Sequence, residues 1–335
     1  MFLCLRFQIP VVTILIVFAD ALEPPTLLPD EPKKPLTAPS HSSHLKFKRR
    51  IAEESSRIPL ICFSLSFITR IKAPIMAVMG KAKEAGLPLM KLIKLRGMPI
   101  LQQLHLEERL LRTSSDNWCL INDGTNSPAI VMGLSGKLSE LVKVKPVLQD
   151  RIPIIKRFTG GGTVVVDHDT LFVTLICNKD AVSNVQPFPR SIMSWSGLLY
   201  SEVFKGLDDF HLRENDYVFG DRKFGGNAQS ITKNRWIHHT SFLWDYEVKN
   251  MSYLKLPAKA PQYRLTRSHM DFICRMKEYL PRSEFIERTI KALGSQFSVK
   301  SISLESIDVP SVSEYVHTTK LLTEQEIQET CTVQT

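Results

Sequence analysis

Cysteine is scarce in this chain, and the cysteines present are too scattered to indicate a metal site or a disulfide framework. The six are Cys4, Cys62, Cys119, Cys177, Cys274 and Cys331. No two of them form a CxxC pair, which is how structural zinc sites usually gather their ligands. We therefore expect no metal site, a reducing compartment, and thiols that behave as small buried hydrophobic groups.

Motifs of several common function classes are also missing. The chain has no GxxxxGK[ST] phosphate loop and no GxSxG turn to present a serine nucleophile. It has no long Lys/Arg block either, and its net charge of +9 is distributed over 335 residues. We expect no nucleic-acid partner, although a mildly positive field could steer an acidic protein substrate.

The amino-terminal quarter differs in character from the rest. Its apolar run from Pro10 to Ala19 is too short to span a bilayer, and a proline-rich stretch follows it. We interpret residues 1–75 as a targeting peptide, a linker or a mis-annotated exon, with Met76 or Met79 as the natural start. No membrane association is expected, and the compartment stays open between mitochondrion, cytoplasm and plastid.

Residues 76–300 have the patterning of one globular domain, and residues 301–335 are interpreted as a polar tail. Helices are predicted over 99–112, 191–204, 269–280 and 282–293, and strands over 118–123, 129–133, 152–158, 163–167 and 170–178, with three more within 215–246. Because strands come in runs with helices set apart, the pattern predicts an α+β fold with a mainly antiparallel sheet flanked by helices.

Three consecutive glycines, Gly160 to Gly162, lie between β-branched runs in KRFTGGGTVVVD. Glycine there costs backbone entropy, which is usually offset by a close approach that a Cβ would forbid. With Arg157 before the triplet and Thr159 opening it, a cation and backbone N–H groups could surround an anionic ligand. A hairpin turn with spare glycines is the alternative.

Lys223 lies in NDYVFGDRKFGGNAQ, between a turn at Gly220 and a glycine pair. A lysine on a strand beside a glycine-rich bulge can direct its ammonium into a pocket, and Asp216 could orient that ammonium. A lysine on a strand is otherwise a solvated surface charge. His238 and His239 should face opposite sides of one strand, and their simplest interpretation is one packed and one solvated ring.

Together these segments resemble the lipoate-protein ligase family, within the superfamily of biotin/lipoate ligases and octanoyltransferases. KRFTGGGTV is similar to the family's RRxxGGGxV, and LQQLHLEERLL to its NLAxEExLL opening. The second and third segments resemble NDxxV…GxxKxxGxA…HHGTLL, with Thr240 and Ser241 replacing Gly-Thr. Val166 before Asp167 and Leu134 after Gly133 depart from the family pattern. The resemblance extends over about residues 95–290.

The resemblance implies a catalytic core like that of class II aminoacyl-tRNA synthetases and biotin ligases. It also implies transfer of a lipoyl group through lipoyl-AMP to a lysine of an acceptor lipoyl domain. The expected acceptors are lipoyl domains of 2-oxoacid dehydrogenase acyltransferase subunits or the H protein of glycine cleavage. Lipoate would be the substrate, with ATP and Mg²⁺ or preformed lipoyl-AMP. Lys223 is the implied catalytic residue.

The residues implied to bind substrate or adenylate are Arg157, Thr159, Gly160, Gly161, Gly162, Thr163, Asn215, Asp216, Gly225, Gly226, Asn227, Ala228 and His239. Val131, Val164 and Val165 are expected to line an apolar tunnel for the acyl chain. Beyond about residue 300 we expect too little chain for the accessory domain that many bacterial ligases use in adenylation, so activation could depend on a separate enzyme.

Two other functions fit a related fold. An octanoyltransferase, acting from octanoyl carrier protein, would need a thiolate near the lysine, and Cys177 is the reserve candidate. A non-catalytic scaffold that binds lipoyl domains is the second alternative, against which the retention of Lys223 with both glycine segments argues. Biotin ligase is less favoured because the chain lacks a GRGRxxR loop.

Overall fold

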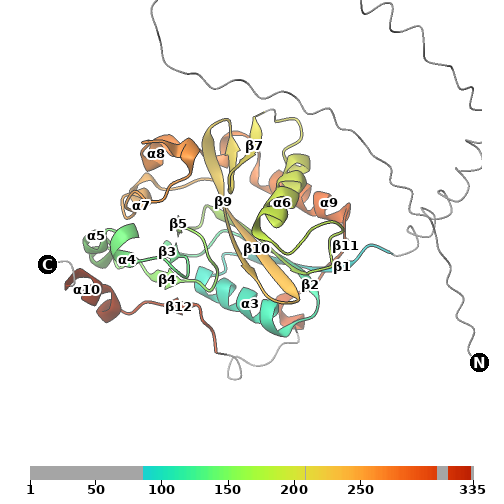
Figure 1. Cartoon of the computed structure of the whole chain (residues 1–335), viewed down its shortest axis with the longest axis horizontal. Helices are drawn as coiled ribbons and strands as arrows, with labels where there is room; N and C mark the ends of the chain where they lie inside the picture. Colours follow the sequence, from blue (N-terminus) through green and yellow to red (C-terminus); the bar gives the residue numbers. More distant parts are fainter. Residues whose placement is uncertain (1–85, 208, 308–315, 333–335) are drawn as a thin grey trace, which may run out of the picture. The chain divides into compact units, whose positions relative to one another are not determined.

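The computed structural model describes residues 86–207, 209–307 and 316–332, and the interpretation of residues 1–75 as an extension lies outside them. The described chain forms two β-sheets with helices packed around them (Figure 1). No described helix combines the length and the hydropathy needed to cross a membrane.

The larger sheet has eight strands in the order β11-β1-β2-β6-β10-β9-β8-β7 among the described residues. Their bounds are β1 Leu89–Arg96, β2 Asn117–Asp123, β6 Thr170–Asn178, β7 Phe210–Arg213, β8 Asp216–Phe219, β9 Arg222–Ile231, β10 Arg235–Leu243 and β11 Ser298–Ser301. Only the β11·β1 and β1·β2 pairs are parallel. The predicted α+β fold with a mainly antiparallel sheet is therefore confirmed.

The smaller sheet has the order β12-β4-β3-β5. Its strands are β3 Ala129–Met132, β4 Ile154–Lys156, β5 Thr163–Val166 and β12 Lys320–Leu321, and the helices near it are α4 Leu138–Leu141, α5 Val144–Gln149 and α10 Glu324–Thr332. Residues from 301 onward were interpreted as a tail, but β12 pairs with β4 and Ile327 of α10 is buried among the apolar residues of this sheet. The periodic signal of this segment is short, which is why the sequence did not reveal it.

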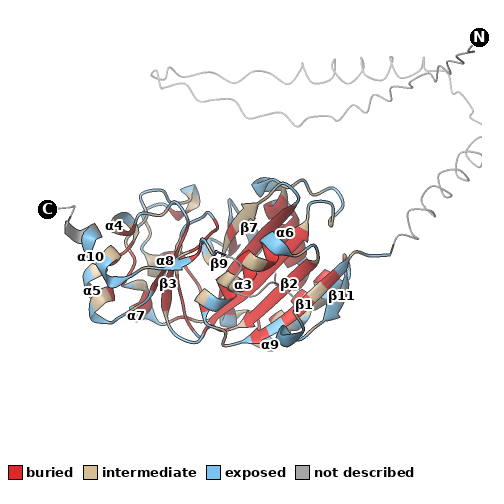
Figure 2. Ribbon diagram, turned by 90° about the horizontal axis from the view of Figure 1, so that it is seen from below, coloured by how far each residue is buried: buried red, intermediate tan, exposed pale blue. Residues whose placement is uncertain are grey.

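Helices cover both faces of the larger sheet, and the alternation of side chains along β2 divides the core accordingly. Cys119 and Ile121 face α6 (Pro189–Val203) and α9 (Arg282–Gly294), whereas Trp118 and Leu120 face α3 (Ile100–Thr113). Figure 2 shows the central strands almost entirely buried between these layers. The strands of a sheet that is covered on both faces have continuous apolar sequences, such as TLFVTLIC of β6.

Two predictions of local structure need correction. The helix predicted over 269–280 is only α8 His269–Phe272 and a 3₁₀ turn at Met276–Glu278, because Ile273 and Cys274 are extended and pair with Lys223. The sequence also did not predict strands β1, β7 and β11. For β7 and β11 the reason is that they are short strands with exposed polar residues at or near the edges of the sheet. The remaining connections hold α7 Val248–Met251 and 3₁₀ turns at Gln262–Arg264 and Leu304–Ser306.

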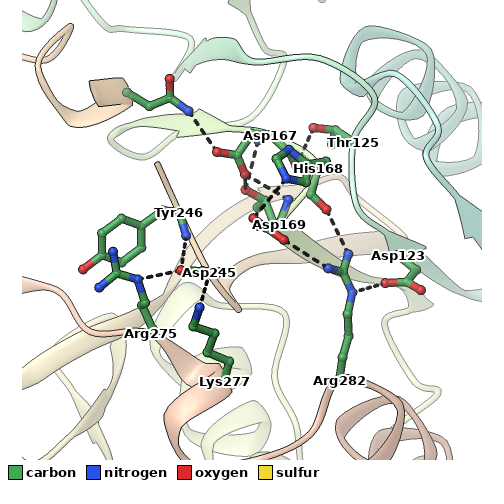
Figure 3. Close-up of polar contacts among 12 residues, drawn as sticks. Asp123, Thr125, Asp167, His168, Asp169, Asp245, Tyr246, Arg275, Lys277 and Arg282 are labelled. Atoms are coloured by element: carbon green, nitrogen blue, oxygen red, sulfur yellow. Dashed lines mark hydrogen bonds and ion pairs between the residues drawn. The ribbon is translucent and has the colours of Figure 1, made fainter. Parts of the chain in front are cut away.

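A charged cluster connects the segments in which the chain passes between the two sheets (Figure 3). Its members are Asp123, Asp169, Asp245, Arg275, Lys277 and Arg282. Arg282 at the start of α9 contacts Asp123 at the end of β2 and Asp169 in the β5–β6 turn. After β10, Asp245 binds Arg275 and Lys277. Since the segment before Arg275 pairs with the Lys223 backbone, the cluster also anchors the surroundings of that lysine.

Candidate functional site

Lys223 lies at the start of β9, and its ammonium is fixed by Asp216 of the neighbouring strand β8. The Nζ to Oδ1 distance is 2.7 Å, and the side chains are 27% and 8% exposed. The other carboxylate oxygen of Asp216 accepts a hydrogen bond of 2.8 Å from the hydroxyl of Tyr263. The predicted role of Asp216 in orienting the ammonium thus matches its geometry, while Tyr263 had not been foreseen.

Gly226 makes room for this lysine. A Cβ on Gly226 would lie 3.3 Å from both Cε and Nζ of Lys223 and 3.6 Å from Oγ of Ser241. The ammonium therefore lies on the face of β9 that also carries Ala228, two residues further along. The neighbouring Gly225 serves packing instead, because a Cβ there would meet the Tyr217 ring at 2.9 Å.

The glycine triplet is not a hairpin turn. Strands β4 and β5 each pair with β3, so the loop between them crosses the end of β3 at Gly133. The Gly133 amide donates to the Gly162 carbonyl, and the Leu134 amide donates to that of Thr159. Gly161 has φ +109°, and a Cβ on it would lie 3.4 Å from Cβ of Ala228. The loop therefore rests on the same face of β9 as the Lys223 ammonium.

The buried side chain of Arg157 holds the glycine loop through hydrogen bonds. Its Nη2 donates to the carbonyls of Gly160 and Gly162 at 3.0 and 2.9 Å, and its Nε donates to Oγ1 of Thr159 at 2.9 Å. Burial lowers the pKa of this guanidinium to about 10, against the attraction of Glu107. Four of its five N–H groups are thus engaged within the protein, one of them by the Val131 carbonyl, and the expected role of Arg157 beside an anionic ligand stays a prediction.

Two groups of the loop remain available to a ligand. The amides of Gly161 and Gly162 donate no hydrogen bond within the described part of the chain. Thr163 pairs with Met132 and shares the outer face of β5 with Val165, so its hydroxyl does not join them. Because Gly226 and Ala228 are two residues apart on one strand face, these groups and the ammonium are separated by roughly 7 to 10 Å. That gap could hold a carbonyl and an adjoining phosphate.

Both histidines are buried, which corrects the expectation of one solvated ring. His239 faces α3, with Nδ1 2.9 Å from the carboxylate of Glu107. Since a carboxylate only accepts, Nδ1 carries the proton and Nε2 accepts from Thr159 at 3.4 Å. His238 faces α6, and burial followed by the nearby His239 lowers its pKa to about 3. His239 thus supports the glycine loop through Thr159, and His238 lies on the opposite side of the sheet.

The remaining predicted residues divide between the site and its support. The Asn227 carbonyl lies near Gly161, whereas its side chain bonds Thr240 and the carbonyl of Asn215. For Asn215 the contact seen is this carbonyl, which accepts from the Asn227 side chain, so its role at the substrate stays a prediction. Of all these residues, Lys223, Asp216, Gly226, Ala228 and the loop 159–162 come together, whereas Thr163 lies on the outer face of β5 with Val165.

The three valines proposed as tunnel walls do not share a face. Val131 and Val164 pack in the apolar group between β3, β5 and α3, whereas Val165 packs on the outer side with Ile130 and Met132. Successive strand residues point to opposite faces, so Val164 and Val165 could not both line one tunnel. Val131 and Val164 remain candidates.

No cysteine among the described residues presents a thiol to Lys223. Cys177 is fully buried, and burial raises its pKa well above the ordinary thiol value. It lies five residues along β6 from Phe172, and Phe172 is level with Gly226 two strands away, so Cys177 and Gly226 are about 19 Å apart. Cys274 is nearer, since its amide donates to the Lys223 carbonyl, but burial raises its pKa to about 11 and its thiol contacts the Arg222 carbonyl.

Sequence reasoning missed two functional candidates. Glu107 was part of the LEERLL helix and could have been noticed as an acidic residue on an otherwise apolar face. Its carboxylate has no exposed surface and accepts from Gln103, Thr174 and His239. Tyr263 carries no motif, and only the fold brings it to Asp216.

The comparisons with known proteins agree with this geometry. The family model described as lipoyl protein ligase A/B catalytic domain matches residues 99–298. An inactive lipoate–protein ligase 2 of Plasmodium falciparum is 30% identical over 231 residues, covering 58% of this chain and 59% of that protein. The chain spans about half to three fifths of the length of the first curated relatives that it matches.

Two solved structures share the fold. A lipoate-protein ligase A bound with ATP has a TM-score of 0.54 at 15% identity, covering 66% of this chain and 91% of that chain. A bipartite lipoate protein ligase of Thermoplasma acidophilum, described with its E2 lipoyl domain, has a TM-score of 0.54 at 16% identity, covering 72% and 91%.

Proposed function

Because the chain belongs to the family of lipoyl protein ligase A/B catalytic domains, we propose that it transfers a lipoyl group from lipoyl-AMP to a lysine of an acceptor lipoyl domain. The observation that carries the proposal is the Lys223 ammonium, held by Asp216 on the strand face against which the glycine loop, with its two unpaired amides, also packs. The fold shared with a ligase described with its E2 lipoyl domain supports the choice of acceptor.

In the proposed reaction the acceptor amine attacks the acyl carbon. A C–N bond forms, the C–O bond to the phosphate of AMP breaks, and the amine proton passes to the departing phosphate or to water. Negative charge grows first on the carbonyl oxygen and then on the phosphate. The Lys223 ammonium would donate to these oxygens, while the amides of Gly161 and Gly162 hold the phosphate. Preorganised donors of this kind stabilise the transition state without reorganising during the reaction.

Formation of lipoyl-AMP from lipoate and ATP is the extended form of the proposal, in which the same groups would meet the α-phosphate. A Mg²⁺ ion would enter the site bound to the phosphates of ATP. Among the described residues no group of three potential ligands is placed to hold a metal, and both oxygens of Asp216 are engaged.

The experiment presents lipoyl-AMP, lipoate with ATP and Mg²⁺, or octanoyl carrier protein to the full chain with an acceptor lipoyl domain. The mass of the acceptor reports transfer. We expect transfer from lipoyl-AMP. Transfer only from octanoyl carrier protein would replace this proposal with the octanoyltransferase.

A lipoyl-domain-binding scaffold is the second candidate, and the relative named as an inactive ligase favours it. The two functions differ in one measurable way. A scaffold binds the acceptor lipoyl domain but leaves its lysine unmodified with every donor, whereas the proposed enzyme modifies it.

A further inference from the structure

The segment 317–321 lies along the residues that lead into the glycine loop. Lys320 and Leu321 pair with Lys156 and Ile155 of β4 (Figure 1). The hydroxyl of Thr319 accepts a hydrogen bond of 3.1 Å from the amide of Phe158. This segment, which the sequence suggested was a tail, therefore contacts the chain immediately before Thr159.

Glu108 of α3 holds Thr319 in place. Its carboxylate is fully buried and accepts from the amides of Thr318 and Thr319, both at 3.1 Å, and from the Thr318 hydroxyl. Burial acts to raise the pKa of Glu108, but these hydrogen bonds and the charge of Arg112 outweigh it, so the pKa lies below its ordinary value. The carboxylate is therefore a charged anchor at neutral pH.

The adjacent Glu107 points to the other side of the helix and reaches Thr159 through His239. Two successive acidic residues of α3 thus fix two successive residues of the loop entrance. Glu107 acts on the Thr159 side chain, and Glu108 acts on the Phe158 amide through Thr319.

We propose that Thr319, anchored by Glu108, is a positioning residue that sets where the glycine loop meets the acyl-adenylate. This inference rests on the proposed function. Phe158 is buried, so its amide cannot exchange the Thr319 hydroxyl for water without local opening. The three glycines beyond Thr159 have little conformational preference of their own, so the loop takes its position from its hydrogen bonds to Arg157, Gly133 and Gln229 together with the residues that precede it.

The test compares Thr319→Val, which keeps the shape and removes the acceptor, with Thr319→Ser, which restores it. Thr113→Val is the matched control, because the Thr113 hydroxyl is exposed and donates only to the Arg109 carbonyl of its own helix. Hydrogen exchange is measured on peptides covering 158–163 and 117–123 without ligand. The KM and kcat for lipoyl-AMP are measured with a lipoyl domain as acceptor.

We expect Thr319→Val to raise exchange in 158–163 by about tenfold and to leave 117–123 unchanged, because an unpaired buried donor shifts the local equilibrium by roughly that factor. KM should rise about tenfold with kcat within threefold, and Thr319→Ser and Thr113→Val should behave like the unaltered protein. Unchanged loop exchange, equal acceleration in both peptides, or failure of serine to rescue would overturn the inference. If the unaltered protein transfers nothing, the proposed function fails, while the exchange measurement still decides the positioning role.

Discussion

Replacement of Lys223 by alanine removes the group on which the proposed transfer depends. Loss of one preorganised donor costs about 3 kcal/mol of transition-state stabilisation, a factor of 10² to 10³ in rate. The structure adds a second effect, because Asp216 would keep its charge with only Tyr263 as partner. At about 7 Å from a phosphate, this charge adds repulsion of roughly 2 kcal/mol at an effective dielectric constant of about 20. We therefore expect the rate to fall by a factor of about 3 × 10³ to 3 × 10⁴.

The two contributions can be separated by adding Asp216→Asn to Lys223→Ala. The double variant should recover about thirtyfold over the single one, because the repulsion of roughly 2 kcal/mol is removed while the donor stays absent. Lys223→Arg should also fail, since a planar guanidinium cannot replace a compact ammonium between a carbonyl and a phosphate. The control is Lys205→Ala, an exposed lysine 3.7 Å from Glu202, which should change the rate by less than about twofold.

The assay is the initial rate of acceptor lipoylation at saturating lipoyl-AMP, with melting curves for every variant. Activity above about a third of the unaltered protein in Lys223→Ala or Lys223→Arg, with an unchanged melting curve, would refute the assigned role. A double variant no faster than Lys223→Ala would refute the electrostatic part alone.

Four further outcomes can be checked. Cys177→Ala should keep most transfer activity, and an acyl group trapped on Cys177 by mass spectrometry would contradict this. Tyr263→Phe should lower kcat by about three- to tenfold with little change in melting temperature, because the Asp216 carboxylate loses a hydrogen bond that orients it. Gly161→Ala should weaken lipoyl-AMP binding and lower the urea midpoint, because φ is +109° and the added Cβ would lie 2.8 Å from the Arg157 guanidinium. Burial lowers the pKa of His238 from 6.5 to about 3, so between these pH values the unfolded chain binds a proton that the folded chain does not. The free energy of unfolding should therefore fall by about 1.4 kcal/mol for each pH unit from 6.5 down toward 3. Urea titrations of His238→Gln at several pH values should lack this contribution.

Much of the site could be predicted because its parts have local signatures. The glycine triplet, the strand lysine and the histidine pair each come from a short segment, and Asp216 and Lys223 are close in sequence and meet through a β-hairpin. The central strands were equally visible, since a sheet covered on both faces leaves long β-branched runs. These are properties of neighbouring residues, which a single sequence records.

What could not be predicted depends on crossings between distant segments. The role of Arg157 follows from the loop passing over Gly133, and that crossing exists because β3 lies between β4 and β5. The link from Tyr263 to Asp216 spans 47 residues, and the link from Glu108 to Thr318 spans 210. No periodicity encodes such contacts. Alternation along a strand predicts that His238 and His239 face opposite sides of the sheet, which suggested that one ring is solvated. It does not reveal that helices cover both faces of this sheet and bury both rings.

The charges retained at the site bear on the choice between an enzyme and a scaffold. A buried ion pair adds little net stability, because desolvation offsets the attraction, so folding alone does not account for Lys223 and Asp216 in this position. A surface that only docked a folded lipoyl domain would gain nothing from placing this pair beside the unpaired amides of Gly161 and Gly162. The cost of the pair is offset when a polar ligand such as an acyl-adenylate bonds to the ammonium, which favours a site that binds the adenylate over a scaffold.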